Sequence, residues 1–242
     1  MTWFAGAFFK IATIVFVIVL FGFQWSQGYF RKLGLSLKTA GIGIPPAPLF
    51  TLFLLGMAAV TADPYLLKLI RESAHPFSKF IASFGGFLGR NIHPWAMVFL
   101  LYIAGWVSRR RVLSKVAFGC LVSAVLASIC TFLLKFIFLR ARPYAMMGHL
   151  SFLNWAGLSE DARKFQSFSS GDVAVVAGIV FYLFITLKQH FLKWFLVLLP
   201  LSTAFSRIAA NKHWPSDTFI SMAVGFIVAR FVIHHERIDC KD

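Results

Sequence analysis

The segment Leu113–Phe138 limits how this chain can fold more than any other feature, because it is almost entirely apolar over an unusual length. A helix needs roughly 20 mostly apolar residues to cross about 30 Å of hydrocarbon. This segment is long enough to cross, with its last turn emerging at Lys135. Composition agrees: 59% of the 242 residues are hydrophobic and only 14% are charged, against about half and about a quarter in soluble domains. We therefore expect an integral membrane protein.

Further apolar segments are candidate helices, and several of them are shorter than a full span. They are Ile11–Trp25, Leu49–Ala62, Pro94–Val107, Val173–Leu187, Phe191–Ser206 and Thr218–Ile233. The first segment has no Ala-x-Ala-like cleavage site after it, so we expect it to be retained; whether it crosses fully is open. The prediction is an all-α, polytopic transmembrane helical bundle, with a six-helix core and one extra N-terminal hydrophobic helix. Residues 1–48 would form that helix and a cytoplasmic connector, and residues 49–242 the transmembrane domain.

The stretch Asp63–Arg90 differs from these segments because apolar side chains alternate with basic and acidic ones at roughly helical spacing. A helix of this kind lies in the membrane interface more readily than it spans. A cap packed over the helix bundle accounts for the pattern equally well. We expect Asp63 itself to cap this stretch.

The charged residues are strongly unbalanced, since 24 Lys and Arg against 9 Asp and Glu give a net charge of +15. In a soluble protein this excess would suggest nucleic acid, but the apolar composition argues against that partner. Lys and Arg in short loops mark the cytoplasmic side, and Arg109–Arg111 is the densest cluster. Threading the helices alternately from this side brings the charged helix ends together on the opposite side, at Lys135, Asp172, Arg207 and Asp217.

Lys135 and Arg207 of this group, together with Arg142, bring three cations that suit a phosphate. Ionisable residues at membrane depth are costly and are functional candidates by default. Arg142 and Arg207 offer planar forks that match phosphate oxygens, and Lys135 adds a point charge. Ser170 and Gly171 supply a hydroxyl and an unhindered backbone N–H at a helix start, where free N–H groups and the helix dipole favour anions. We predict a phosphate pocket at the membrane surface.

His213 and Asp217 stand four residues apart at the mouth of the last helix. A carboxylate bonded to one imidazole nitrogen fixes the tautomer and leaves the other nitrogen as nucleophile or base. Zinc would need three or four ligands, and the other histidines are scattered, so we expect no metal and no cofactor. Three cations can neutralise the charge that develops in phosphoryl transfer.

These residues follow a fixed spacing, Lys135-x6-Arg142-Pro143, then Ser170-Gly171, then Ser206-Arg207-x5-His213-x3-Asp217. The pattern resembles the three-part signature of the type-2 phosphatidic acid phosphatase superfamily, over about Leu113 to Ile233. The resemblance implies a six-helix core with its active site at the outer membrane surface. It implies that His213 attacks phosphorus to form a phosphohistidine and that Asp217 orients His213. The residues that it implies for holding the phosphate are Lys135, Arg142, Ser170, Gly171 and Arg207.

The middle part departs from the family pattern Pro-Ser-Gly-His, because Ser169 replaces the proline and Asp172 the histidine. In the family that histidine protonates the leaving oxygen. A carboxylate near three cations favours its charged form and is a poor acid at neutral pH. Three explanations stay open: Asp172 donates a proton when desolvated; the leaving group needs little help, or His149 substitutes; or the chain has weakened or no activity. A Gly-Asp variant is similar to some bacterial lipid A 4'-phosphatases.

The resulting prediction is a metal-independent lipid phosphatase at the periplasmic face of the bacterial inner membrane, with lipid A favoured as substrate. Other substrates are polyprenyl diphosphate and phosphatidylglycerophosphate, and a lipid phosphotransferase is the related alternative. A non-catalytic phospholipid-binding protein or a transporter is the alternative from another class. Arg140 is open between phosphate and lipid headgroup, and we expect His149 to be a solvated loop residue. The oligomeric state is open.

Overall fold

The computed structural model describes residues 46–73, 75–90, 92–155 and 161–238, and within these ranges its regular structure is entirely helical. The chain divides into two compact units: one comprises Pro45–Val232, and the other comprises the two ends of the chain. The expected N-terminal helix Ile11–Trp25 lies outside the described residues. The six-helix core with an additional N-terminal helix therefore stays a prediction, whereas the all-α class is confirmed for the described residues.

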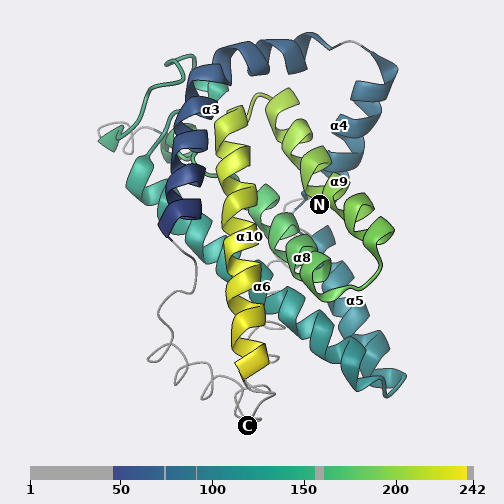
Figure 1. Ribbon diagram of the computed structural model, residues 1–242. Helices are drawn as coiled ribbons and strands as arrows, with labels where there is room; N and C mark the ends of the chain where they lie inside the picture. Colours follow the sequence, from purple (N-terminus) through teal and green to yellow (C-terminus); the bar gives the residue numbers. More distant parts are fainter. Residues whose placement is uncertain (1–45, 74, 91, 156–160, 239–242) are drawn as a thin grey trace. The chain divides into compact units, whose positions relative to one another are not determined.

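Seven α-helices make up most of the described chain (Figure 1). They are α3 (Pro46–Glu72), α4 (Pro76–Leu88), α5 (His93–Val107), α6 (Arg111–Phe138), α8 (Gly171–Thr186), α9 (His190–Ala209) and α10 (Pro215–Ile238). Two short 3₁₀ helices, η1 (Pro143–Ala145) and η3 (Ala162–Phe165), lie in the connection between α6 and α8. The predicted segments that became α5, α6, α8, α9 and α10 are confirmed to within a few residues.

Three segments of the described chain are long and apolar enough to cross a membrane. They are Arg111–Ala145, Phe191–Ala209 and Pro215–His235. The segments of α5 and α8 are apolar but shorter. An α-helix satisfies its backbone hydrogen bonds within the segment, which is what hydrocarbon requires of a spanning segment. The chain is a helical membrane protein.

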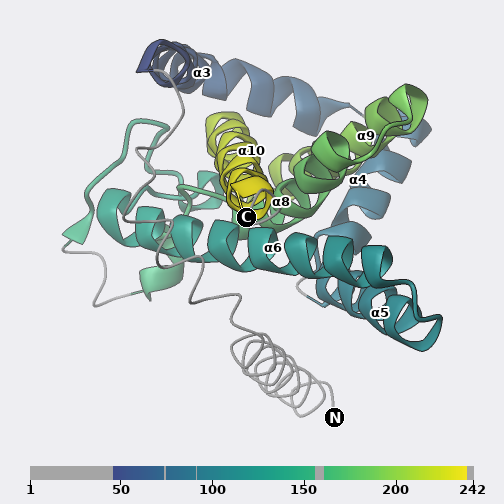
Figure 2. The ribbon, with the colours of Figure 1, turned by 60° about the horizontal axis from the view of Figure 1, so that its bottom comes forward.

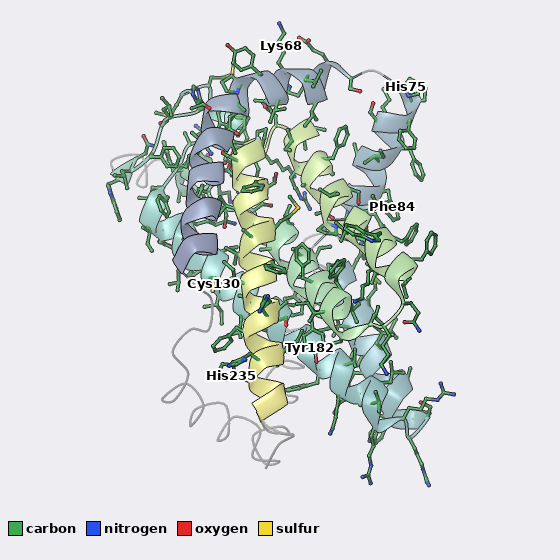
Figure 3. All side chains as sticks on the ribbon, viewed as in Figure 1. Lys68, His75, Phe84, Cys130, Tyr182 and His235 are labelled. Atoms are coloured by element: carbon green, nitrogen blue, oxygen red, sulfur yellow. The ribbon has the colours of Figure 1, made fainter. Side chains whose placement is uncertain are left out.

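Helix α3 does not end at Ala62, as the apolar segment predicted, but continues to Glu72. Pro64 lies inside α3, and a proline in a helix interior removes a hydrogen bond and bends the axis. Figure 1 shows α3 changing direction partway and running on toward α4. The far end of α3 faces outward, where Figure 3 shows Lys68 pointing away from the packed helices. The expected capping role of Asp63 is wrong, because this residue lies within α3 and is fully buried.

The second half of the amphipathic stretch forms α4, which packs along α9. The two helices meet closely at Gly85, where a Cβ atom would lie 1.8 Å from the backbone oxygen of Ser202. The outer face of α4 leaves four large apolar side chains exposed, Phe77, Phe80, Phe84 and Phe87, of which Figure 3 labels Phe84. Helix α4 thus combines the two features expected of the stretch, a face packed on the bundle and an exposed apolar face.

The remaining helices pack through small residues. Helix α5 lies along α6, and α8 contacts both α6 and α9 (Figures 1 and 2). Gly119 of α6 faces the ring of Tyr182 on α8, which is labelled in Figure 3. A Cβ at Gly225 of α10 would lie 2.6 Å from Cβ of Ala177 on α8. Small residues let helix backbones approach closely where apolar lipid gives no hydrophobic drive to association.

Candidate active site

The ends of four helices carry the residues that the sequence singles out. Lys135 lies in the last turn of α6 and Arg207 in the last turn of α9. Helix α8 begins at Gly171, where a Cβ would lie 3.8 Å from Nζ of Lys135. Asp172, in the first turn of α8, places Oδ2 3.0 Å from Nε of Arg207. The structure therefore joins the ends of α6 and α9 to the start of α8, as the alternate threading of the helices predicted.

His213 lies between α9 and α10 with 3% of its surface exposed. Its Nδ1 is 2.7 Å from the backbone oxygen of Ser167. Since a carbonyl oxygen can only accept a hydrogen bond, Nδ1 is the donor and carries the ring proton in the neutral imidazole. The lone pair of the neutral ring is then on Nε2, which is the nitrogen left for chemistry.

The charge state of His213 is set by its surroundings. Burial lowers the pKa of His213 well below the usual 6.5, and the positive charges of Arg142, Lys135 and Arg207 lower this pKa further, while the bond to Ser167 opposes them. The imidazole is therefore neutral at neutral pH. All three of the predicted phosphate-binding cations are thus close enough to His213 to lower its pKa.

Asp217 lies in the first turn of α10 and is completely buried. Its Oδ2 accepts hydrogen bonds from Oγ of Ser167 at 2.5 Å and from the backbone N–H of Trp214 at 2.9 Å. Its distance to Nδ1 of His213 is 4.0 Å, too long for a hydrogen bond. Ser167 lies between the two, bonding His213 through its carbonyl and Asp217 through its hydroxyl. No spacing rule in the sequence identified Ser167.

Arg140 takes neither of the two roles considered for it, because its side chain is fully buried and paired within the protein. Its guanidinium donates to Oδ1 of Asp217 at 2.6 Å and to Oδ2 of Asp63 at 2.5 Å. Further bonds reach Oγ of Ser216 at 2.7 Å and the backbone oxygen of His149. His149 is partly buried rather than fully solvated, and its ring lies 6.2 Å from that of Trp214.

Several buried polar atoms at the ends of these helices have no hydrogen-bond partner among the described residues. The hydroxyl of Ser170 does not cap α8, although Ser170 is the residue before it. Nε of Arg207 is near Asp172 but not aligned for a hydrogen bond. An unsatisfied buried donor costs about 1–3 kcal/mol, and an anion with several oxygen atoms would satisfy such a group. Four of these unpartnered atoms belong to predicted site residues or their direct neighbour: Ser169 Oγ, Ser170 Oγ, Arg142 Nε and Arg207 Nε.

The backbone N–H of Ser170 is already used, because it donates to Oγ of Ser221 at 2.7 Å. Ser221 in turn donates to the backbone oxygen of Asp217, which ties the start of α8 to the first turn of α10. Within the described residues, no group of three His, Cys, Asp or Glu side chains is placed to hold a metal ion. The residues predicted to hold phosphate are cations, a hydroxyl and the start of a helix.

Comparison with known proteins shows which family has this sequence pattern and this fold. The family model described as PAP2 superfamily matches residues 116–237, just over half of the chain. The crystal structure of LpxE from Aquifex aeolicus shares the fold with a TM-score of 0.54 and 22% identity, over 71% of this chain and 94% of that chain. A search of curated proteins gave no match. The signature residues all fall inside the matched segment, and the chain accordingly belongs to the PAP2 superfamily, the type-2 phosphatidic acid phosphatases.

Proposed function

We propose that this chain removes phosphate from a membrane lipid phosphate, with lipid A the favoured substrate, through a covalent intermediate on His213. The observation that carries the proposal is a buried imidazole whose Nδ1 bonds the carbonyl of Ser167 and whose Nε2 is left for attack. Burial and three nearby cations keep this ring neutral. Family membership supports phosphatase chemistry on a lipid. A lipid substrate also agrees with a site at the ends of apolar helices.

The reaction has two steps. In the first, the Nε2 lone pair of His213 attacks phosphorus, and an N–P bond forms as the bond from phosphorus to the lipid oxygen breaks. The electron pair of the broken bond stays on that oxygen, which takes a proton from a general acid. In the second step, water attacks phosphorus and gives up a proton to the acid's conjugate base, and the N–P electrons return to Nε2. Inorganic phosphate and the dephosphorylated lipid are the products.

Each predicted residue has a role in this scheme. Lys135, Arg142 and Arg207 hold the phosphate and neutralise charge in the transition state. The unpartnered hydroxyl of Ser170 and the open backbone at Gly171 bind further phosphate oxygens. The orienting role of Asp217 acts through Ser167, which bonds both residues.

Asp172 is the proposed general acid. Burial raises the pKa of Asp172, and the positive charges of Arg207 and Lys135 oppose this rise without cancelling it. The carboxyl is therefore a better proton donor than its neighbouring cations alone would predict. With 25% of its side chain exposed, it remains open to exchange a proton with water or substrate. No metal or cofactor takes part in this scheme.

The location follows from charge. Arg109–Arg111 stands at the start of α6, and Lys135 lies in its last turn, at the other end of the same helix. If the arginine cluster is on the cytoplasmic side, as basic short loops generally are, the site faces the periplasm of a bacterial inner membrane. The division into residues 1–48 and 49–242 is part of the same proposal. The Gly-Asp pair at Gly171 and Asp172 is the sequence feature that favours lipid A over phosphatidylglycerophosphate or polyprenyl diphosphate.

The test is phosphate release by the detergent-solubilised chain from a panel of lipid phosphates, with His213→Ala as the inactive variant. We expect release from lipid A to exceed release from the other lipids, and we expect an acid-labile phosphate on wild-type protein that His213→Ala lacks. Tight binding of a lipid phosphate with no release from any lipid would contradict the proposal and favour a binding protein. Transfer of the phosphate to a second lipid would instead make the chain a phosphotransferase.

A further inference from the structure

Asp63 is a buried carboxylate that lies outside both the signature and the segment matched by the family model. It belongs to α3 and is fully buried. Its Oδ1 accepts a hydrogen bond from the backbone N–H of Ser216 at 2.7 Å. Its Oδ2 accepts from Oγ of Ser216 at 2.6 Å and from Arg140 at 2.5 Å. A carboxylate of one helix thus holds the first turn of another, α10.

The charges of this cluster depend on one another. Arg140 is a single buried cation between two buried carboxylates, those of Asp63 and Asp217. A buried charge is tolerated only when it is paired and fully hydrogen-bonded, and Arg140 meets this condition by bonding both carboxylates together with Ser216 and the oxygen of His149. Removing the charge of Asp63 would leave Asp217 as the one carboxylate paired with Arg140. It would also weaken the hydrogen bonds that Asp63 accepts from Ser216 and Arg140, because a neutral amide oxygen is a poorer acceptor than a carboxylate.

The cluster reaches the reacting nitrogen in a short series of contacts. Asp63 holds Ser216 and Arg140, and Arg140 and Ser216 fix the first turn of α10 around Asp217. Asp217 accepts from the hydroxyl of Ser167, and the carbonyl of Ser167 accepts from Nδ1 of His213. None of the hydrogen bonds of Asp63 in the described structure goes to Lys135, Arg142 or Arg207.

We propose that Asp63 is a positioning residue that holds the first turn of α10 and, through Arg140, Asp217 and Ser167, fixes the tautomer and aim of His213. The proposal rests on the proposed role of His213 as nucleophile. The contacts of Asp63 lead to His213 and not to the cations that hold the phosphate. Loss of Asp63 should therefore slow the chemical step and leave substrate binding unchanged. A position error of this kind near a reacting atom costs a large factor in rate.

The experiment compares Asp63→Asn with wild-type protein purified in detergent. We expect kcat to fall at least ten-fold, KM to stay within two-fold, and the affinity and stoichiometry of inorganic phosphate binding to stay unchanged. In ¹⁵N-histidine NMR spectra, assigned with His213→Gln, wild-type protein should show one His213 tautomer with the proton on Nδ1. Asp63→Asn should show loss of that single tautomer.

A milder variant keeps the test decisive if Asp63→Asn folds poorly. Ser216→Ala removes one hydroxyl from the cluster and retains every charge, and we expect a several-fold lower kcat with the same KM. The matched control is Ser123→Ala, which removes a buried α6 hydroxyl without a hydrogen-bond partner, and its kcat should equal that of wild type.

Two results would overturn the positioning role. One is a kcat within two-fold of wild type and an unchanged His213 tautomer in Asp63→Asn, joined by a wild-type kcat in Ser216→Ala. The other is a fall in kcat that equals the fall in the number of phosphate-binding sites per chain. That result would mean that fewer molecules are folded, and that Asp63 contributes to folding only. Wild-type protein that releases no phosphate from any lipid would contradict the proposed function, and the tautomer comparison would still decide the role of Asp63.

Discussion

The neutral state of His213 is a property of the fold rather than of histidine, which ordinarily titrates near pH 6.5. Burial, with the positive charges of Arg142 and Lys135, lowers the pKa of His213 well below that value. We therefore expect His213 to stay mostly neutral at pH 6.5 and the acid limb of kcat/KM to lie below that pH. Histidine NMR titration and a pH profile of kcat/KM measure the two quantities.

The same shift predicts how stability depends on pH. In the unfolded chain His213 binds a proton as the pH falls through about 6.5, whereas in the folded protein its pKa is lower and the ring remains neutral. Unfolding therefore takes up a proton in that window, and stability falls as the pH drops from 6.5 toward the folded pKa. His213→Gln should remove this share of the pH dependence. Thermal unfolding curves with the same pH dependence in both proteins would contradict the lowered pKa.

Asp172 gives a separate prediction at the residue scale. A positioned general acid contributes about 10²–10⁴-fold to a rate, so Asp172→Asn should lower phosphate release by a factor in this range while moving the melting temperature little. Phosphate release across pH and a melting curve are the measurements, and His149→Gln is the comparison for the alternative acid. Equal rates in Asp172→Asn and wild type at every pH would remove the acid role from Asp172.

At the scale of helices, the crossing of α4 over α9 depends on Gly85. A methyl group there would lie 1.8 Å from a backbone oxygen of Ser202, which cannot move independently of α9. Gly85→Ala should therefore destabilise the protein by about 1–3 kcal/mol, the usual cost of overpacking. Gly86→Ala is the matched control, since its methyl group would meet the Ser206 side-chain hydroxyl, which can rotate. Equal melting temperatures in the two variants would contradict the close crossing.

Helix positions could be predicted from sequence where a local pattern alone determines where the helix begins and ends. An apolar run bounded by charged or turn residues located α5, α6, α8, α9 and α10 to within a few residues. The end of α3 could not be predicted, because Asp63 and Pro64 look like a helix boundary in sequence. The helix continues because Asp63 is neutralised by Arg140, a partner 77 positions away. Spacing likewise located the signature residues but not Ser167, whose contacts to His213 and Asp217 depend on the folded loop.

For the whole molecule, orientation in the membrane is the property to test. Ser108, next to the Arg109–Arg111 cluster, and Met147, in the connection after α6, are both exposed. In a chain with its own cysteines replaced, Met147→Cys should react with a membrane-impermeant maleimide added to intact spheroplasts. Ser108→Cys should react only after lysis. The reverse pattern would place the site on the cytoplasmic side.

The buried Asp63 also sets the smallest unit that could be moved or shortened in protein engineering. A fragment that starts at α5 would contain every signature residue and every group proposed to touch phosphate. It would nevertheless lack α3 and with it Asp63. Arg140 would then keep one of its two carboxylate partners, and the backbone N–H of Ser216 in the first turn of α10 would lose its acceptor. Grafting the three signature segments onto another helical scaffold would meet the same deficit. A fragment meant to keep the contacts around Asp217 must accordingly be longer than the signature and include α3.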